Sequence, residues 1–240
     1  MKITFRIRKQ KKNGGEVSYQ DIFYETAGEG DTVAMALQAI ENGLCTDESG
    51  QTAGAVAWEC SCLQKKCGAC AMLINGRPEL ACDARISDHI NAEKGRTVIT
   101  LEPLSKFPVI EDLRVDRSVM YDNLKDMKLY MNDSADIRSQ KSRDTAYDAS
   151  RCLQCGCCLE VCPNFYAGGS FFGAAAAASG SRVLSSEPVK ASSELRSEYS
   201  RHVFAGCGKS LACRNICPAG IDIGHMLSNS NAISIWRRHA

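Results

Sequence analysis

Arg151–Pro163, which reads R-C-L-Q-C-G-C-C-L-E-V-C-P, decides the fold of the second half of this 240-residue chain. Cys152, Cys155, Cys158 and Cys162 stand at the spacing C-x2-C-x2-C-x3-C and are followed directly by a proline. This spacing is typical of proteins in which three thiolates bind one iron–sulfur cluster and the fourth binds a second cluster. The stretch therefore predicts a pair of clusters held within one domain.

A second, incomplete copy of this run lies 55 positions further along the chain, where Cys207 corresponds to Cys152. The copy has cysteines at its first, third and fourth positions, but Ser210 stands at its second position. Two such runs that exchange their fourth ligands form a two-cluster unit. This exchange assigns one cluster to Cys152, Cys155, Cys158 and Cys217, and the other to Cys162, Cys207 and Cys213.

Ser210 indicates which kind of cluster the second site holds. A neutral hydroxyl is a hard, weak donor for a site that otherwise consists of soft thiolates. We therefore expect a three-iron [3Fe-4S] cluster whose corner near Ser210 is empty. The alternative is a four-iron cluster with the serine oxygen or a water molecule at that corner.

Zinc and disulfide bonds explain the cysteines less well. Structural zinc sites pair two short cysteine loops around one tetrahedral ion and do not need this run twice. Dense cysteines also occur in small secreted proteins, but this chain is long. We also expect no secretory signal, because no apolar segment follows its basic N-terminus. The fourteen cysteines thus indicate a reducing compartment or bound metal.

Composition and charge restrict the class of protein further. The chain is 44% hydrophobic and 24% charged, which is typical of a globular protein with a buried core. A formal net charge of +1 gives no reason to expect nucleic acid as a partner. Residues 170–180 form the longest small, apolar stretch, and they are too few to span a bilayer. We therefore expect no direct membrane span, and any membrane contact to be made through a partner.

The N-terminal half begins with a pattern of two strands and a helix. Ile3, Phe5 and Ile7 alternate with polar residues, so residues 2–9 are expected to form a half-buried strand. After a polar turn, residues 17–26 form the partner strand. Asp31 or Thr32 can cap a helix that runs through Asn42 and ends at Gly43. This order of elements opens a β-grasp domain.

A different cysteine pattern follows that helix. Cys62, Cys67, Cys70 and Cys82 have the plant-type spacing of a [2Fe-2S] site, C-x4-C-x2-C with a fourth cysteine further on. The loop between the first three would point backbone N–H groups at the sulfurs. Residues 71–75 and 80–82 are expected to form a hairpin around a turn at residues 76–78, and residues 98–101 the last strand.

The remaining segments are expected to be helical. Residues 112–143 are charged and resemble a helical connector. Residues 171–184 are rich in alanine, residues 185–193 form a polar loop, residues 194–204 lead to the second cysteine run, and residues 221–236 form a last amphipathic helix. We place the domain boundary between residues 105 and 106, giving domains 1–105 and 106–240.

Four sequence stretches together resemble one family. They are C-G-A-C-A-M-L-I-N-G-R-P-E-L-A-C from Cys67, F-P-V-I-E-D-L-R-V-D from Phe107, R-C-L-Q-C-G-C-C from Arg151, and C-x5-C-x3-C-P from Cys207. The chain, over essentially its whole length, is similar to the iron–sulfur subunits of succinate dehydrogenase and fumarate reductase. The resemblance implies an α+β protein, in which a β-grasp [2Fe-2S] ferredoxin-like domain precedes an all-α dicluster domain of the bacterial-ferredoxin type.

The resemblance also implies ligands, partners and location. It assigns [2Fe-2S] to Cys62, Cys67, Cys70 and Cys82, [4Fe-4S] to Cys152, Cys155, Cys158 and Cys217, and [3Fe-4S] to Cys162, Cys207 and Cys213. It implies electron transfer from an FAD-containing flavoprotein subunit, the site of succinate and fumarate chemistry, to a membrane-anchor cytochrome b or quinone subunit, or in the reverse direction. The complex would serve the tricarboxylic acid cycle or anaerobic respiration at the cytoplasmic face of the cell membrane.

The chain departs from the family pattern in two places. Residues 63–66 read L-Q-K-K where relatives usually have R-E-G-I. Ala167 and Gly208 stand where many quinone-reducing relatives have an aromatic residue and a histidine. In this respect the chain resembles relatives that pass electrons to a haem-bearing membrane subunit.

Three other functions remain open from the sequence. The chain could serve a different flavoprotein, act as a freestanding electron carrier, or be a zinc structural module. No catalytic constellation and no flavin-binding glycine motif is found, so we expect no catalytic residue on this chain. His89, His202, His225 and His239 form no acid–base pattern, Cys45 and Cys60 are expected to serve packing, and Cys157 is expected to lie beside the cluster without binding it.

Overall fold

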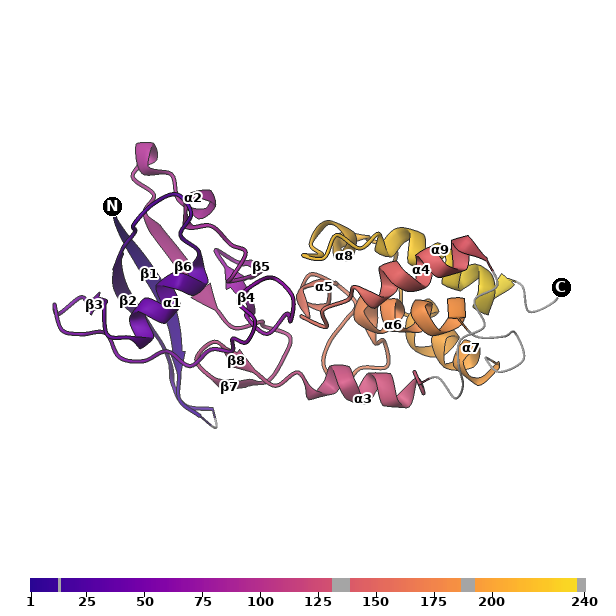
Figure 1. Cartoon of the computed structure of the whole chain (residues 1–240). Helices are drawn as coiled ribbons and strands as arrows, with labels where there is room; N and C mark the ends of the chain where they lie inside the picture. The colour runs from indigo at the N-terminus through magenta and orange to yellow at the C-terminus, as the bar shows by residue number, and fades with distance from the viewer. Residues whose placement is uncertain (13, 131–138, 187–192, 237–240) are drawn as a thin grey trace. The chain divides into compact units, whose positions relative to one another are not determined.

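The computed structural model describes residues 1–12, 14–130, 139–186 and 193–236 (Figure 1). The chain separates into two compact units, Met1–Asp116 and Arg117–Ala240, which are described in turn. The domain boundary expected from the sequence lies earlier, between residues 105 and 106. The expected division into domains 1–105 and 106–240 stays a prediction.

The first unit is built on a six-stranded mixed sheet with the order β3-β2-β1-β6-β4-β5. Its strands are β1 (Lys2–Gln10), β2 (Val17–Glu25), β3 (Thr46–Asp47), β4 (Ala71–Ile74), β5 (Arg77–Leu80) and β6 (Val98–Glu102). Strands β1 and β2 form the expected antiparallel hairpin, and β6 runs parallel to β1. Ile3, Phe5 and Ile7 are completely buried, so the alternation in the sequence marks the core face.

Helix α1 (Val33–Glu41) crosses one face of this sheet (Figure 1). Thr32 caps it as expected, because its hydroxyl accepts a hydrogen bond of 3.3 Å from the Met35 N–H. Gly43 follows the helix in the left-handed conformation, with φ +71°. A short helix α2 (Ile86–His89) and a 3-10 turn (Ala92–Lys94) complete the connection to β6. The β-grasp expectation is confirmed.

The hairpin β4–β5 corrects one expectation. Its turn is Asn75–Gly76, with φ +49° and +77°, and not residues 76–78. Arg77 and Pro78 therefore belong to β5, and Cys82 lies in a turn beyond the strand. Two consecutive residues with positive φ form the tight turn whose twist matches a β-hairpin. Pro78 is tolerated because β5 is an edge strand.

The connector is also less helical than expected. Strands β7 (Val109–Glu111) and β8 (Arg114–Val115) form a small ribbon, and Asp112 turns the chain between them with φ +46°. Helix α3 (Ser118–Asp126) then begins the second unit. Expected helical residues 131–138 lie outside the described residues.

The second unit is helical and is centred on α6 (Gly173–Ser186). The described residues give α4 (Gln140–Ser150), α5 (Cys157–Glu160), α7 (Ser193–Tyr199) with a π-helical turn (Ser200–Phe204), α8 (Ala212–Asn215) and α9 (Ile223–Ser234). Helix α6 packs against α4 and α9, and its buried alanines allow these close approaches. Ser181 and Ser230 share a hydrogen bond of 2.6 Å between α6 and α9.

The expected alanine-rich and C-terminal helices are confirmed, with bounds shifted by a few residues. Of the expected polar loop 185–193, residues 185 and 186 belong to α6 and residue 193 begins α7, while residues 187–192 lie outside the described part.

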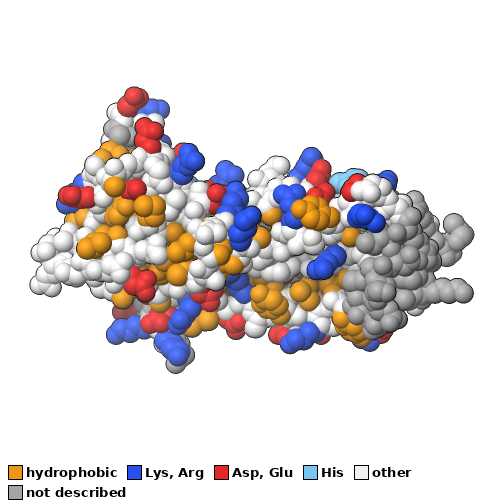
Figure 2. Space-filling view, viewed as in Figure 1, with side chains coloured by type: hydrophobic (Ala, Val, Ile, Leu, Met, Phe, Trp, Pro, Cys, Tyr) orange, Lys and Arg blue, Asp and Glu red, His pale blue; other side chains and the backbone are white. Residues whose placement is uncertain are grey.

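Among the described helices, none is long and apolar enough to cross a membrane. Figure 2 shows basic and acidic side chains interspersed on the visible face of both units.

Candidate metal centres

The first group of cysteines lies in the first unit, on the loop between Cys62 and Cys70 and at Cys82. The N–H groups of Gln64 and Lys66 each donate to Cys62 Sγ at 3.3 Å, and the Lys65 N–H donates to Cys82 Sγ at 3.3 Å. Neighbouring amides of one short loop thus hold sulfurs that are far apart in the sequence. Such N–H···S contacts stabilise negative charge on the sulfur.

The shape of this loop explains why its amides point inward. Leu63 and Lys65 have φ +52° and +57°, and Gly68 has φ +75°. When left-handed residues alternate with right-handed ones, successive N–H groups turn toward one concave side of the loop. Such a concave side is known to bind anions. Lys65 adopts this conformation although it carries a side chain. Its Nζ also pairs with Asp83 Oδ2 at 2.6 Å, beside Cys82.

Helix α1 holds Cys82 from the other side. The first N–H groups of a helix have no partner inside it. Here the Val33 N–H donates to the Ala84 carbonyl and the Ala34 N–H to the Ala81 carbonyl, each at 2.9 Å. These two bonds bracket Cys82. The Ala81 N–H in turn donates to the carbonyl of Cys70 at 3.0 Å, which joins the third and fourth cysteines.

Asp112 fixes the segment that leads into the cluster loop. Its buried carboxylate accepts hydrogen bonds from the N–H groups of Gln10 at 3.0 Å and Ala57 at 2.9 Å, and it pairs with Lys9 Nζ. The Leu113 N–H also donates to the Ala57 carbonyl. The sequence places Asp112 in a charged connector, so its role as an anchor for this loop was missed.

The thiols of the loop differ in acidity. Hydrogen bonds from the Gln64 and Lys66 N–H groups lower the pKa of Cys62 to about 7. Burial raises the pKa of Cys70 to about 12, because that thiol is almost completely shielded from water. A bound cation would offset the effect of burial and favour the thiolate form of Cys70.

The second group lines one pocket in the helical unit. Its lining includes Cys152, Cys155, Cys158 and Cys217, among mainly apolar neighbours such as Ile221 and Ile223. Arg151 donates to the carbonyl of Ala219, so a hydrogen bond joins the residue before Cys152 to the segment after Cys217. The structure thus brings together the four residues that the crossover between the two runs requires.

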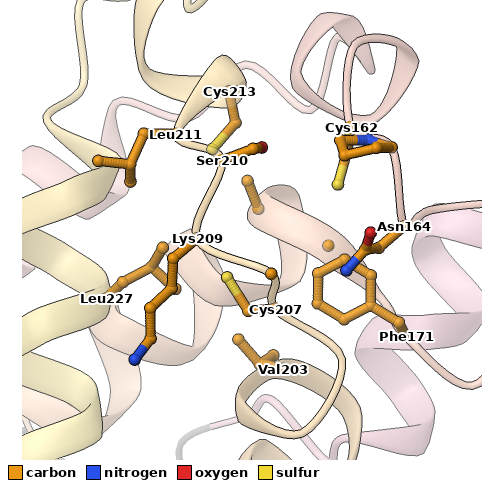
Figure 3. Close-up of a pocket in the computed structure, with 14 residues that line it drawn as sticks. Cys162, Asn164, Phe171, Val203, Cys207, Lys209, Ser210, Leu211, Cys213 and Leu227 are labelled. Atoms are coloured by element: carbon orange, nitrogen blue, oxygen red, sulfur yellow. The ribbon is translucent and has the colours of Figure 1, made fainter.

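The third group lines a separate pocket. Figure 3 shows Cys162, Cys207 and Cys213 around a common space, with Ser210 beside Cys213. Asn164 Nδ2 donates to the carbonyl of Gly206 at 2.7 Å, which joins the segment after Cys162 to the segment before Cys207. The lining also includes the apolar side chains of Phe171, Val203, Leu211 and Leu227 and the polar side chains of Lys209 and Ser210.

Burial affects the thiols of the helical unit strongly. It raises the pKa of Cys152 to about 11 and raises the pKa values of Cys158 and Cys213. Cys155 differs, because a hydrogen bond from the Cys157 thiol lowers its pKa to about 7. Cys157 is fully buried and lines neither of these two pockets. In the sheet unit Cys45 is buried, as expected for a packing residue, whereas Cys60 is exposed, so the packing role expected for Cys60 is wrong.

These donor sets fit iron–sulfur clusters better than single ions. In the described part of the chain, no three His, Cys, Asp or Glu side chains are close enough to hold one metal ion. A zinc ion would require thiolates at about 2.3 Å from a single centre. In a cluster the thiolates are distributed over two or more irons, so the sulfurs form a wider ring. The assignment of individual cysteines to individual clusters remains a prediction.

Comparison with known proteins agrees with this division. A family model described as a 2Fe-2S iron-sulfur cluster binding domain matches residues 4–122, and one described as a 4Fe-4S dicluster domain matches residues 148–221. The succinate dehydrogenase iron-sulfur subunit of Bacillus subtilis is 36% identical over 184 residues, which are 72% of this chain and 70% of that protein. The fumarate reductase iron-sulfur subunit of Wolinella succinogenes is 31% identical over 169 residues, covering 65% and 68%.

One solved structure shows the same fold over the whole chain. It is a chain of the Mycobacterium smegmatis Sdh1 complex in the apo form, with a TM-score of 0.71 and 21% sequence identity. The similarity covers 100% of this chain and 99% of that one.

Proposed function

Because this chain belongs to the family of iron–sulfur subunits of succinate dehydrogenase and fumarate reductase, we propose that it conducts single electrons between two partner subunits. One partner is an FAD-containing flavoprotein that interconverts succinate and fumarate. The other is a membrane-anchor cytochrome b or quinone subunit. The chain is then the electron-transfer subunit of an oxidoreductase complex on the cytoplasmic face of the cell membrane, attached through its partners.

The observation that supports this proposal most directly is the exchange of cysteines between the two runs. One pocket contains three cysteines of the first run and Cys217 of the second. The other contains Cys162 of the first run and two cysteines of the second. Two adjacent all-thiol sites suit electron transfer, because iron–sulfur clusters, when bound, accept and release one electron each.

The chain's own residues have three roles under this proposal. Thiolates of the named cysteines hold [2Fe-2S], [4Fe-4S] and [3Fe-4S] clusters. Backbone N–H groups of Gln64, Lys65 and Lys66 stabilise the sulfurs of the first site. Mainly apolar linings in the helical unit lower the polarity around the clusters, which together with these hydrogen bonds tunes the reduction potentials.

Electron paramagnetic resonance on the anaerobically purified complex tests the proposal. We expect a near-isotropic [3Fe-4S] signal in the oxidised sample and a [2Fe-2S] signal after mild reduction. Ser210→Cys supplies a thiolate at the empty corner, so the oxidised signal should disappear while the iron content rises.

Two results would contradict the proposal. An oxidised wild-type sample with full iron and no signal would mean that the second helical site already holds four irons. Purification of the chain alone, without a flavoprotein, would favour a freestanding electron carrier.

A further inference from the structure

Gln154 makes a contact that the cysteine pattern does not require. Its side-chain Nε2 donates to Cys152 Sγ at 3.3 Å and to Ser179 Oγ at 3.0 Å. Gln154 lies between Cys152 and Cys155, and Ser179 lies on α6. A side-chain amide, braced by the central helix, therefore faces one sulfur of the predicted [4Fe-4S] site.

The direction of the amide is set by the chemistry of its surroundings. The opposite orientation would place the amide oxygen against a thiolate, and two electron-rich atoms repel each other. Gln154 Oε1 is instead buried away from the sulfur and has no hydrogen-bond partner among the described residues. The contact with Cys152 is thus kept although a buried oxygen is left without a partner, which is unfavourable.

The backbone at Gln154 adds a second cost. Its φ is +51°, a left-handed conformation that glycine adopts more readily than residues with a side chain. Glycine would satisfy this turn but would provide no donor. Strain of this kind is often kept at functional sites, where a particular side chain is needed.

We propose that Gln154 raises the reduction potential of the cluster bound through Cys152, by donating a hydrogen bond to its sulfur. This inference rests on the proposed electron-transfer function. Reduction adds negative charge to the cluster and its thiolates, and a hydrogen-bond donor stabilises that charge. Gln154 acts through Cys152 and does not bind iron. Ser179 holds the amide in place.

The test compares Gln154→Leu and Gln154→Glu in the purified holo complex. The leucine removes the donor, and the glutamate keeps the shape but places a negative charge near the sulfur. Redox titrations followed by electron paramagnetic resonance give the potential of each cluster. For Gln154→Leu we expect a three- to tenfold fall in the one-electron equilibrium constant for reduction of [4Fe-4S], which at tenfold is about 59 mV. Gln154→Glu should lower it further.

Two controls make the result specific. Gln140→Leu changes a glutamine on α4 that bonds only to Asp144 among the contacts described, and it should leave all potentials unchanged. The [2Fe-2S] potential serves as a reference within each sample and should also stay constant. Ser179→Ala keeps the donor but removes its brace, so it should cause a smaller fall than Gln154→Leu.

Several outcomes would overturn the inference. One is an unchanged [4Fe-4S] potential in both Gln154 variants at full iron content. Another is loss of the cluster in both variants, which would show a structural role. An equal shift in the Gln140→Leu control would also overturn it. Failure of the proposed function is seen separately, because the wild-type sample would then lack the three cluster signals or the flavoprotein.

Discussion

At the scale of single residues, the loop around the first site depends on a lysine in an unfavourable conformation. Lys65 has φ +57° and donates its N–H to Cys82 Sγ. Its ammonium group is half exposed and pairs with Asp83, which is equally exposed. An exposed ion pair stabilises a protein little, so the pair does not offset the cost of the backbone.

We therefore predict that Lys65→Gly is more stable than Lys65→Ala by about 1 kcal/mol. Both variants lose the ion pair, but only glycine accepts a positive φ without strain. Chemical denaturation of the two purified proteins gives the difference. Equal midpoints, or a more stable alanine variant, would show that the loop does not hold this conformation.

Both variants should also lower the [2Fe-2S] potential, because a positive charge is removed beside it.

At the scale of elements, the start of α1 joins the sheet to the cluster site. Asp31, just before the helix cap, is buried and accepts hydrogen bonds from Tyr24 Oη at 2.8 Å, Thr26 Oγ1 at 2.8 Å and the Ala27 N–H at 2.7 Å. Its own carbonyl accepts from the Ile86 N–H. Asp31 thus binds the end of β2 through its carboxylate and the segment after Cys82 through its carbonyl, directly before α1 begins.

The pKa of Asp31 shows the balance of these contacts. Burial raises it, but the hydrogen bonds from Thr26, Ala27 and Tyr24 lower it more, so the pKa in the folded state lies below its ordinary value. A group of this kind stabilises the fold above its ordinary pKa, and the contribution is lost as the pH falls through the lower, folded value.

We predict that Asp31→Asn lowers the free energy of unfolding by about 1–3 kcal/mol. The difference from wild type should be constant between about pH 5 and 8, where the carboxylate is ionised in both states. It should shrink only in more acidic solution. Thermal unfolding across this range measures it, and Asp88→Asn on the exposed side of α2 is the control. A difference that changes between pH 5 and 8 would contradict the assignment.

The elements also show how far the sequence could be interpreted. Alternation of Ile3, Phe5 and Ile7 predicted β1, and cysteine spacing predicted which thiols share a pocket, because both depend on local periodicity or repeated spacing. The turn at Asn75–Gly76 was expected at residues 76–78, although Asn-Gly is the dipeptide typical of tight hairpins. Asp112 could not be assigned, because its partners lie about 55 and 100 residues away in the sequence.

The same limit applies to the sites. The contact of Gln154 with Ser179 joins a loop to a distant helix. Nothing in the residue types alone indicates this pairing.

At the scale of the whole molecule, the two units have different kinds of core. The sheet unit buries large branched and aromatic side chains, among them Ile3, Phe5 and Ile99. The helical unit buries a run of alanines along α6, which contribute less apolar area per residue than the larger side chains packed around them, such as Phe172 and Tyr199. Five predicted ligands pack against that helical core: Cys152, Cys158, Cys207, Cys213 and Cys217.

We predict that iron removal destabilises the helical unit more than the sheet unit. Loss of the clusters leaves cavities beside the alanines of α6 and releases thiols that hold the segments of this unit together. Limited proteolysis after treatment with chelator, followed by mass spectrometry, should give early cleavage within residues 117–236 and late cleavage within strands β1, β2 and β6. Equal protection of both units would contradict the prediction.

The exchange of cysteines between the two runs has a consequence for the order of biosynthesis. The [2Fe-2S] site has all four proposed ligands once residue 82 has been synthesised. Neither helical site is complete at residue 162, since each needs residues that the ribosome adds only between positions 207 and 217. A nascent chain can therefore receive its first cluster during translation. Under the proposed ligand assignment, the other two clusters are inserted only after the second run has emerged and the bonds from Arg151 to Ala219 and from Asn164 to Gly206 can form.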